Sequence, residues 1–319
     1  FYEARRPTSP NLVSIAVLGD EVPPHGQSYS GDNPLRVTVA VRKGGKPDAE
    51  IAVLRETIRP IGERCPLLKK AVLRGSVALF EALWLGMRAL NFSANESIES
   101  EDGKKEEIGP LAMAGTMIVA LAFALGLFLA LPLLLTHLLG TQYSTFKGNV
   151  LFNLTDGAIR VGLFLGYVSG ISFMKDIRRV FEYHGAEHKV VFNYESGKPL
   201  TVSNAQQFTT WHPRCGTSFL IVVMVVSMIV YMFLPFQTFF GKIMSRLVLI
   251  PVIAGLSYEM IRFAAKRPGS VMAMLTAPGL WLQRITTQPP SDEQAGVAIR
   301  ALEGAMKLET DQGGQAVIA

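Results

Sequence analysis

The sequence predicts a mainly α-helical integral membrane protein with about four transmembrane helices, one interfacial helix, a small β-rich N-terminal region and a metal-site loop. Of the 319 residues, 49% are hydrophobic, and the mean hydropathy of +0.28 is typical of chains with membrane spans. Three of the five histidines and one of the two cysteines lie between positions 184 and 215, in a polar segment flanked by apolar runs. We therefore expect membrane spans on both sides of a metal site.

The N-terminal region 1–60 carries short alternating runs at 12–17, 36–42 and 51–54. Alternation at period two predicts strands, and the Gly- and Pro-rich stretches between them predict loops. A small antiparallel sheet outside the bilayer is the expected result. The segment 66–91 then has a helical pattern whose uncharged run is too short to span, so it predicts an interfacial helix.

Long apolar runs predict transmembrane helices in two segments, 108–174 and 218–263. The individual spans are expected at 111–135, 150–174, 218–234 and 247–262. Basic residues are most frequent between the second and third spans and after the fourth. The positive-inside rule then places the metal-binding segment 175–217 and both termini in the cytoplasm, in a multi-pass protein of the cytoplasmic membrane.

The C-terminal region 264–319 is expected to be cytoplasmic and to contain an amphipathic helix. Ser291, Asp292 and Glu293 are suitable capping residues for a helix ending near 308. A short amphipathic segment at 270–287 is expected to lie at the membrane surface.

The net charge of +5 is explained by cytoplasmic loops more simply than by nucleic acid, because the chain has no patch of interleaved basic and aromatic residues. The expected partners are membrane lipids, other membrane proteins or a second copy of the chain. Cys65 and Cys215 are far apart and do not indicate a disulfide framework. Cys215 is therefore free to act as a thiolate ligand.

His184, Glu187 and His188 form an H-x-x-E-H motif, the mirror of the H-E-x-x-H helix of zinc hydrolases. On a helix, two histidines four residues apart project from one face. His212 and Cys215 form an H-x-x-C pair whose short spacing lets one turn point both side chains at a common centre. The two histidines of the helix and this pair predict a zinc site.

The spacing leaves two kinds of zinc site open. Three protein ligands and a water, with Glu187 as general base, would make a catalytic site. The predicted function is then a membrane-embedded zinc-dependent hydrolase that cleaves a peptide, amide or ester bond at the cytoplasmic membrane surface. Arg214 would stabilise an oxyanion in that reaction, or would simply be one more positive-inside charge. Four protein ligands would instead make a structural His3Cys site in a non-catalytic membrane scaffold or assembly factor.

Asp156 and Arg160 are four residues apart in the second predicted span and can neutralise each other inside a helix bundle. This ion pair could equally well fix the packing of the helices or take part in the function of the protein. A transporter built on them is less favoured, because the chain has no matched pair of broken spans.

Six stretches of the chain resemble the YqhQ-like family of uncharacterised bacterial membrane proteins: YHGAEHK, GKPLTVSNAQQ, HPRCGTSFL, ALNFSANE, MKDIRRVF and PGLWLQRITT. The resemblance extends from about residue 36 to residue 308. It implies a multi-spanning protein of the bacterial inner membrane and a metal-dependent enzyme, an activity that is predicted for the family.

The family that the chain resembles opens with a glycine-rich GGQAVIEG segment ahead of its first strands. This chain instead carries GGQAVIA at 313–319. A circular permutation, or segments numbered out of native order, would explain the position, and chance similarity of seven residues is the alternative. The first explanation predicts that this tail lies beside the N-terminal strands.

Overall fold

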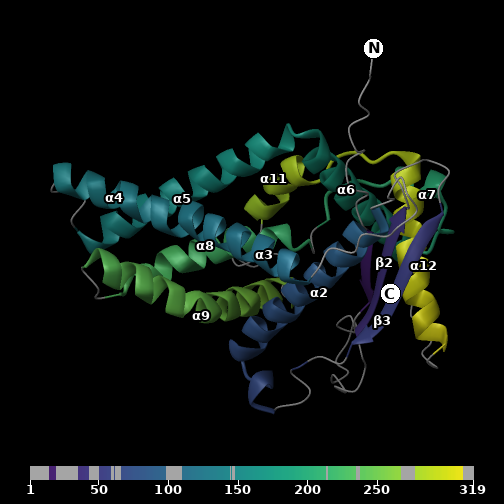
Figure 1. Cartoon of the computed structure of the whole chain (residues 1–319), viewed down its shortest axis with the longest axis horizontal. Coiled ribbons are helices and arrows are strands. Elements are labelled where there is room, and N and C mark those ends of the chain that lie inside the picture. The colour runs from purple at the N-terminus through teal and green to yellow at the C-terminus, as the bar shows by residue number, and fades with distance from the viewer. Residues whose placement is uncertain are drawn as a thin grey trace.

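The computed structural model describes residues 14–18, 35–42, 50–58, 61, 66–97, 110–143, 145, 148–212, 215–234, 238–266 and 277–311. Most of these residues are helical. Figure 1 shows long helices gathered at one end of an elongated molecule, and a small sheet with its covering helices at the other.

The sheet consists of β1 (Ser14–Leu18), β2 (Leu35–Arg42) and β3 (Ile51–Ile58). Both strand pairs are antiparallel and β2 is central. The N-terminal strands predicted from alternation are thus confirmed, and the third continues to Ile58.

Helices cover both faces of this sheet. On one face the buried side chains come from β2 and from α2 (Leu73–Ser97), and they are Val37, Val39, Val41 and Ala89. On the other face they come from β2, α6 (Lys175–Glu195) and α12 (Asp292–Asp311), and they are Ala40, Tyr183, Val297 and Ala301. Successive residues of β2 therefore serve two cores, as the pleat of a strand requires.

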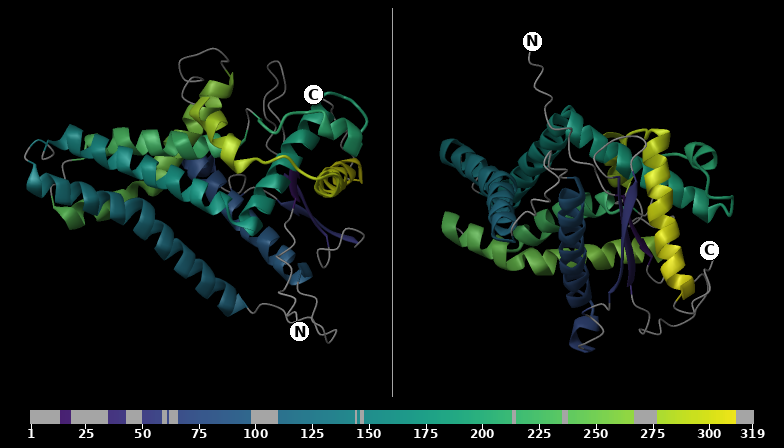
Figure 2. Two further views of the ribbon diagram at one scale, coloured as in Figure 1. Left: turned by 90° about the horizontal axis from the view of Figure 1, so that it is seen from above. Right: turned by 45° about the vertical axis from the view of Figure 1, so that its right-hand side comes forward.

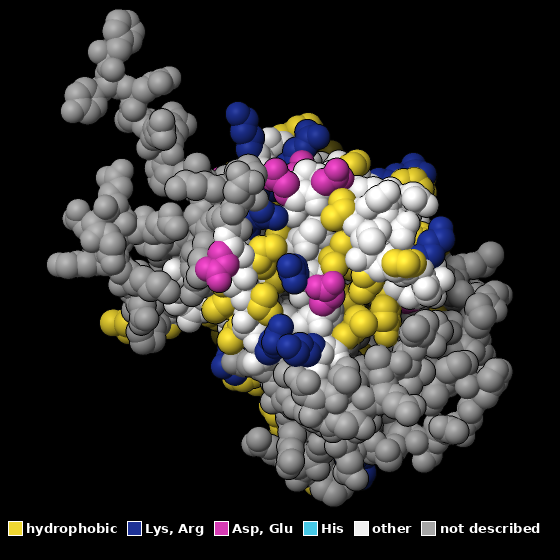
Figure 3. All heavy atoms as spheres, turned by 90° about the vertical axis from the view of Figure 1, so that its right-hand side faces the viewer, with side chains coloured by type: hydrophobic (Ala, Val, Ile, Leu, Met, Phe, Trp, Pro, Cys, Tyr) yellow, Lys and Arg dark blue, Asp and Glu magenta, His cyan; other side chains and the backbone are white. Residues whose placement is uncertain are grey.

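The final helix, α12, begins where its capping residues predict. Ser291 Oγ accepts a hydrogen bond from the Gln294 backbone N–H at 3.3 Å, and Gln294 Oε1 accepts one from the Ser291 N–H at 2.7 Å. This reciprocal pair is a capping box. The predicted apolar face is buried at Ala298, Ala301, Leu302 and Ala305. Figure 3 shows side chains of both charge signs, among hydrophobic ones, on the side of the molecule where α12 lies.

Two apolar helices are long enough to cross a membrane by length and composition. The first joins α3 (Pro110–Leu125), the π-helical segment η3 (Gly126–Ala130) and α4 (Leu131–Gln142). The second is α9 (Phe239–Lys266). Figure 2 shows α3 diverging from the other helices while α4 remains beside them.

The other two predicted spans have different forms. Helix α5 (Asn149–Ser172) bends by 98° into α6, so the pair counts as one broken span or a re-entrant segment. Helix α8 (Thr217–Met232) has 16 residues and is short for a span. Among the described residues, two or three candidate spans therefore replace the four expected.

The fourth predicted span, 247–262, lies inside a longer helix, because α9 begins at Phe239. Lys242 and Arg246 interrupt the apolar run in the sequence, yet both have partners within the bundle. The ammonium of Lys242 lies 3.4 Å from the centre of the Phe152 ring, and Arg246 binds Asp156. Because both cations have partners, the helix continues through positions at which their charges interrupt the apolar sequence.

Asp156 is the polar centre of the helix bundle. Its carboxylate accepts one hydrogen bond from Arg160 at 2.7 Å and another from Arg246 at 2.8 Å. Arg160 also donates to Ser227 Oγ of α8 at 3.0 Å, and both guanidiniums lie over the Tyr231 ring. The predicted Asp156–Arg160 pair is therefore part of a larger cluster that joins α5, α8 and α9.

Helix α2 connects the bundle to the sheet. It follows a short 3-10 helix, η2 (Pro66–Lys69), and continues past the predicted 66–91 boundary to Ser97. Arg74 forms an ion pair with Glu259 of α9. The two helices approach so closely that a Cβ on Gly255 would lie 2.1 Å from the carbonyl oxygen of Val72.

The tail 313–319 lies outside the described residues, so its predicted place beside the N-terminal strands stays a prediction.

Replacing Asp156 with Asn would leave two buried guanidiniums without a counter-charge. Removing one member of a buried ion pair costs about 3–5 kcal/mol, so Asp156→Asn is expected to lower the free energy of unfolding by that order. Denaturant unfolding in detergent micelles measures it. Glu303→Gln is the control, because its ion pair with Arg300 is on the surface and contributes less than about 1 kcal/mol. Equal stability of the two variants would contradict a structural role for the cluster.

Candidate metal centre

Helix α6 carries the first two predicted ligands on one face. His184 and His188 are one turn apart, and their ring centres are 4.5 Å from each other. The helix is amphipathic and buries Tyr183, Ala186 and Val190 against its neighbours. Packing of that apolar face fixes the rotation of the helix, and with it the direction of both imidazoles.

The chain after α6 returns along the same helix. Gly197 has a φ of +69°, the left-handed conformation that commonly ends helices. Lys189 then donates hydrogen bonds to the carbonyl groups of Gln206 and Phe208, both at 2.7 Å. These bonds hold the loop against α6 and bring its end to the histidines.

Each histidine is oriented by a backbone carbonyl group. His184 Nδ1 lies 2.9 Å from the carbonyl oxygen of Thr286, the last residue of α11 (Ala277–Thr286). His188 Nδ1 is hydrogen-bonded to the carbonyl oxygen of Thr210. A carbonyl can only accept, so Nδ1 carries the proton in both rings and Nε2 is the nitrogen left for a ligand. Histidines that bind metals are commonly held in this way.

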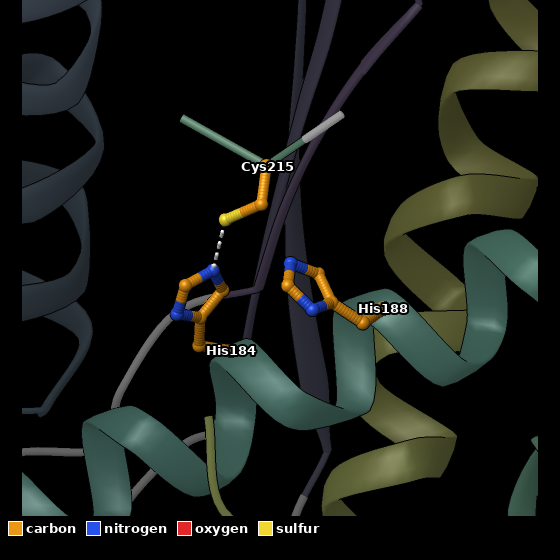
Figure 4. A group of neighbouring side chains, drawn as sticks. All are labelled: His184, His188 and Cys215. Carbon is orange, nitrogen blue, oxygen red and sulfur yellow. Dashed lines mark hydrogen bonds between the residues drawn. The ribbon is translucent and has the colours of Figure 1, made fainter. Parts of the chain in front are cut away.

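Cys215 completes a group of three possible ligands. Its sulfur lies 3.2 Å from His184 Nε2, and one ligand atom from each of His184, His188 and Cys215 falls within 4.8 Å of the others. Figure 4 shows the three side chains pointing toward one another, the histidines from α6 and the cysteine from the segment that precedes α8. The backbone N–H and the hydroxyl of Thr217 also donate to the sulfur, at 3.5 and 3.3 Å.

The surroundings of Cys215 favour its thiolate. Burial by itself raises the pKa of Cys215, but hydrogen bonding with His184, His188 and Thr217, together with the charge of His184, outweighs it and lowers the pKa to about 5. For His184 the effect of burial has the opposite sign, because burial lowers the pKa of an imidazole. The hydrogen bond with Cys215 and the negative charges of Cys215 and Glu187 outweigh it and raise the pKa of His184 above its ordinary value. The thiolate is the form that binds metals.

His212, the fourth predicted ligand, lies beside this group. Its ring centre is 5.6 Å from that of His188, and its Nε2 is 3.7 Å from a carboxylate oxygen of Glu195. Paired hydrogen bonds fix its backbone: the N–H donates to Gln283 Oε1 at 2.8 Å, and Gln283 Nε2 donates to its carbonyl at 2.9 Å. The structure thus assembles three of the four predicted ligands and places His212 against Glu195.

The structure describes one of the two predicted catalytic residues. Glu187 is half-buried on α6, between the two histidines in sequence, and its charge acts on His184. Arg214 lies outside the described residues.

The donor set fits a soft or borderline divalent metal ion. Two imidazole nitrogens and one thiolate suit zinc and are unsuited to magnesium or calcium, which prefer oxygen ligands. Two imidazoles face the single sulfur, which is one donor more than the one base that an activated cysteine nucleophile requires.

Several residues that build the site could not be recognised by their chemistry in the sequence. Thr210 and Thr286 act through main-chain carbonyl groups, for which residue type gives no signal. Gln283 is buried and anchors His212, and it lies in the PGLWLQRITT stretch that resembles the YqhQ-like family.

Comparison with known proteins agrees with that resemblance. Residues 71–308 match the family described as "Protein of unknown function (DUF1385)". The chain belongs to this family. It is also similar to "Uncharacterized protein YqhQ" of Bacillus subtilis (strain 168), with 35% identity over 248 residues, which cover 74% of this chain and 77% of that protein. No solved structure matches the chain.

Within this member of the family, Gly185 lets α6 approach the segment after α11. A Cβ at Gly185 would lie 2.0 Å from the carbonyl oxygen of Gln288. The Gln288 N–H donates to the Phe181 carbonyl at 2.8 Å, which holds the two segments together. The same contact brings Thr286 within reach of His184.

Gly185→Ala is therefore expected to lower the free energy of unfolding by about 1–3 kcal/mol, the usual cost of overpacking, and to displace His184. Unfolding measurements and the bound-metal content of the purified protein check both effects. The control is Gly296→Ala in α12, where an added Cβ meets nothing within 4 Å. It should be neutral or stabilising by up to about 1 kcal/mol. A Gly185→Ala protein as stable and as metal-rich as the control would refute the close contact.

Proposed function

We propose that the protein is a membrane-embedded zinc-dependent hydrolase acting at the cytoplasmic membrane surface. The observation that carries the proposal is the convergence of His184, His188 and Cys215 within 4.8 Å, with both Nδ1 atoms engaged by carbonyl groups. Such preorganised ligands, with their outer partners in place, are what zinc sites in proteins have in common.

The number of ligands favours catalysis over a purely structural role. Structural zinc is usually held by four protein ligands, whereas catalytic zinc keeps one position for water or substrate. Within the described part of the chain three ligands converge, and His212 is directed to Glu195. The proposed coordination is therefore His2Cys with an open position.

Each nearby residue has a role in this proposal. His184, His188 and Cys215 would hold Zn²⁺, which would lower the pKa of a water molecule and polarise the carbonyl group of a substrate. Glu187 would accept the proton of the attacking water and pass it to the leaving group, as a general acid–base residue does. Arg214, one residue before Cys215, is proposed to stabilise the oxyanion.

The second candidate is a membrane scaffold or assembly factor with a structural His3Cys zinc site. The observation that favours it is the position of His212, whose ring centre is 5.6 Å from that of His188. A modest movement of the loop would add a fourth ligand and close the site.

The proposed location is the bacterial inner membrane, with several spans and with the metal centre and both termini in the cytoplasm. Apolar side chains support insertion: Ile118, Val119 and Leu121 of α3 are each more than 60% exposed. Only 11% of the most apolar part of the span Ala114–Gln142 is buried within the chain. Lipids would cover this surface, together with other membrane proteins or a second copy of the chain.

We expect the purified protein to carry about one zinc ion per chain, because its three convergent ligands suit that ion. His188→Ala should remove most of it, while His137→Ala in α4, which is remote from the group, should not. His212→Ala separates the two candidates. It should retain zinc if the site is His2Cys and lose it if the site is His3Cys. Zinc-free wild-type protein would contradict both.

Turnover is tested with membrane extracts as a mixture of substrates, because the proposal names the class of bond that is cleaved and no single substrate. Wild-type protein should generate new amine, hydroxyl or carboxyl ends that mass spectrometry detects, and Glu187→Gln should bind zinc normally but generate none. Identical products from the two proteins would refute the hydrolase.

Orientation is tested by labelling single cysteines in cells, in a background lacking Cys65 and Cys215. A cysteine at Ser196, exposed after α6, should react only after the cells are permeabilised, whereas one at Thr141, exposed at the end of α4, should react from outside. Labelling of Ser196→Cys from outside would reverse the assignment.

A further inference from the structure

A pocket of about 440 Å³ lies where the start of α6, the end of β2 and the start of α12 meet. Its volume is within the range of about 300–1,000 Å³ that is usual for small-molecule sites. Six of its lining residues are charged: Arg42, Lys175, Arg178, Arg179, Glu182 and Glu293.

Positive charge predominates in this pocket, because four of those six residues are basic. Arg178 is partly neutralised by Glu182, at 3.5 Å. The side chains of Lys175 and Arg179 form no hydrogen bond or ion pair with any residue that the structure describes. Among the described residues, Lys175 and Arg179 thus have no counter-charge of their own, and they lie beside the N-terminus of a 21-residue helix, whose dipole also favours negative charge.

The pocket is distinct from the metal group. Lys175, Arg179 and Glu182 are spaced by four and three residues and share one face of α6. Glu182 and His184 are two residues apart, which is roughly 200° around a helix of 3.6 residues per turn. The basic pocket and the histidines therefore lie on opposite faces of the same helix.

The position of the pocket along the chain indicates its ligand. Lys175 follows the end of the apolar helix α5 at Ser172 by three residues, at the 98° bend into α6. With α5 in the bilayer, as in the proposed function on which this step rests, the bend lies at the level of the lipid phosphates. Lysine and arginine at that level attract anionic headgroups.

We propose that this pocket binds the phosphate of an anionic phospholipid headgroup. The bound headgroup fixes the α5–α6 bend at the membrane surface, through Lys175 and Arg179. It thereby sets the height of α6, and of the metal group on its other face, above the bilayer.

The test uses the full chain, delipidated in dodecyl maltoside and titrated with phosphatidylglycerol or phosphatidylcholine. Native mass spectrometry counts the retained lipids, and thermal unfolding gives the stabilisation. The variant is Lys175→Gln/Arg179→Gln. The matched control is Arg300→Gln/Lys307→Gln, which removes the same charge from another surface pocket over α12.

Phosphatidylglycerol is expected to stabilise the wild type and the control more than phosphatidylcholine does. The Lys175→Gln/Arg179→Gln protein should bind phosphatidylglycerol on the order of tenfold more weakly. Equal binding by this variant and the control would overturn the proposal. Equal stabilisation by soluble glycerol phosphate would overturn the choice of a lipid.

Carbonate extraction of membranes distinguishes this outcome from failure of the proposed membrane insertion. A wild-type protein that resists extraction yet shows no preference for phosphatidylglycerol refutes the lipid site alone. A protein released by carbonate refutes the insertion of α5 as well.

Discussion

The close approach of α6 to the segment that follows α11 is the constraint on which the metal centre depends. Gly185 allows it, because a side chain there would meet the Gln288 carbonyl oxygen at 2.0 Å. The approach places the Thr286 carbonyl against His184 Nδ1, and this bond directs the other ring nitrogen to Cys215. The chemistry of the site thus depends on main-chain contacts between elements about a hundred residues apart in sequence.

Helices α2 and α6 connect the apolar bundle to the sheet. Helix α2 packs against α9 through the Arg74–Glu259 ion pair and against β2 through Ala89. Helix α6 continues from α5 after a bend and covers the other face of the sheet. The sheet is therefore held between two helices that both lead into the bundle, and the metal centre lies on one of them.

Much of this arrangement could be predicted from the sequence where one residue type carries the signal. Alternation located the strands, Ser291 located the start of α12, and the spacing of His184, His188 and Cys215 located three converging ligands. Residue patterns are less informative where partners are distant in sequence. Arg246 lies just before the predicted span 247–262, yet Asp156 on another helix accommodates it within α9. The position of His212 beside the group depends on Gln283 and Glu195. Spacing alone cannot distinguish a ligand from its neighbour.

The carboxylate of Asp156, shared by Arg160 and Arg246, has a consequence for biogenesis. Arg246 is separated from Asp156 by 90 residues, so α5 is synthesised well before its second cation. In a membrane, α5 can enter with its own internal pair, but α9 would bring an arginine whose insertion alone costs about 2.5–3.5 kcal/mol. Retention of α9 would then depend on α5 already being in place. The buried cluster would act as a checkpoint on the order of assembly, and a chain with a misplaced α5 would expose an unstable helix to quality control.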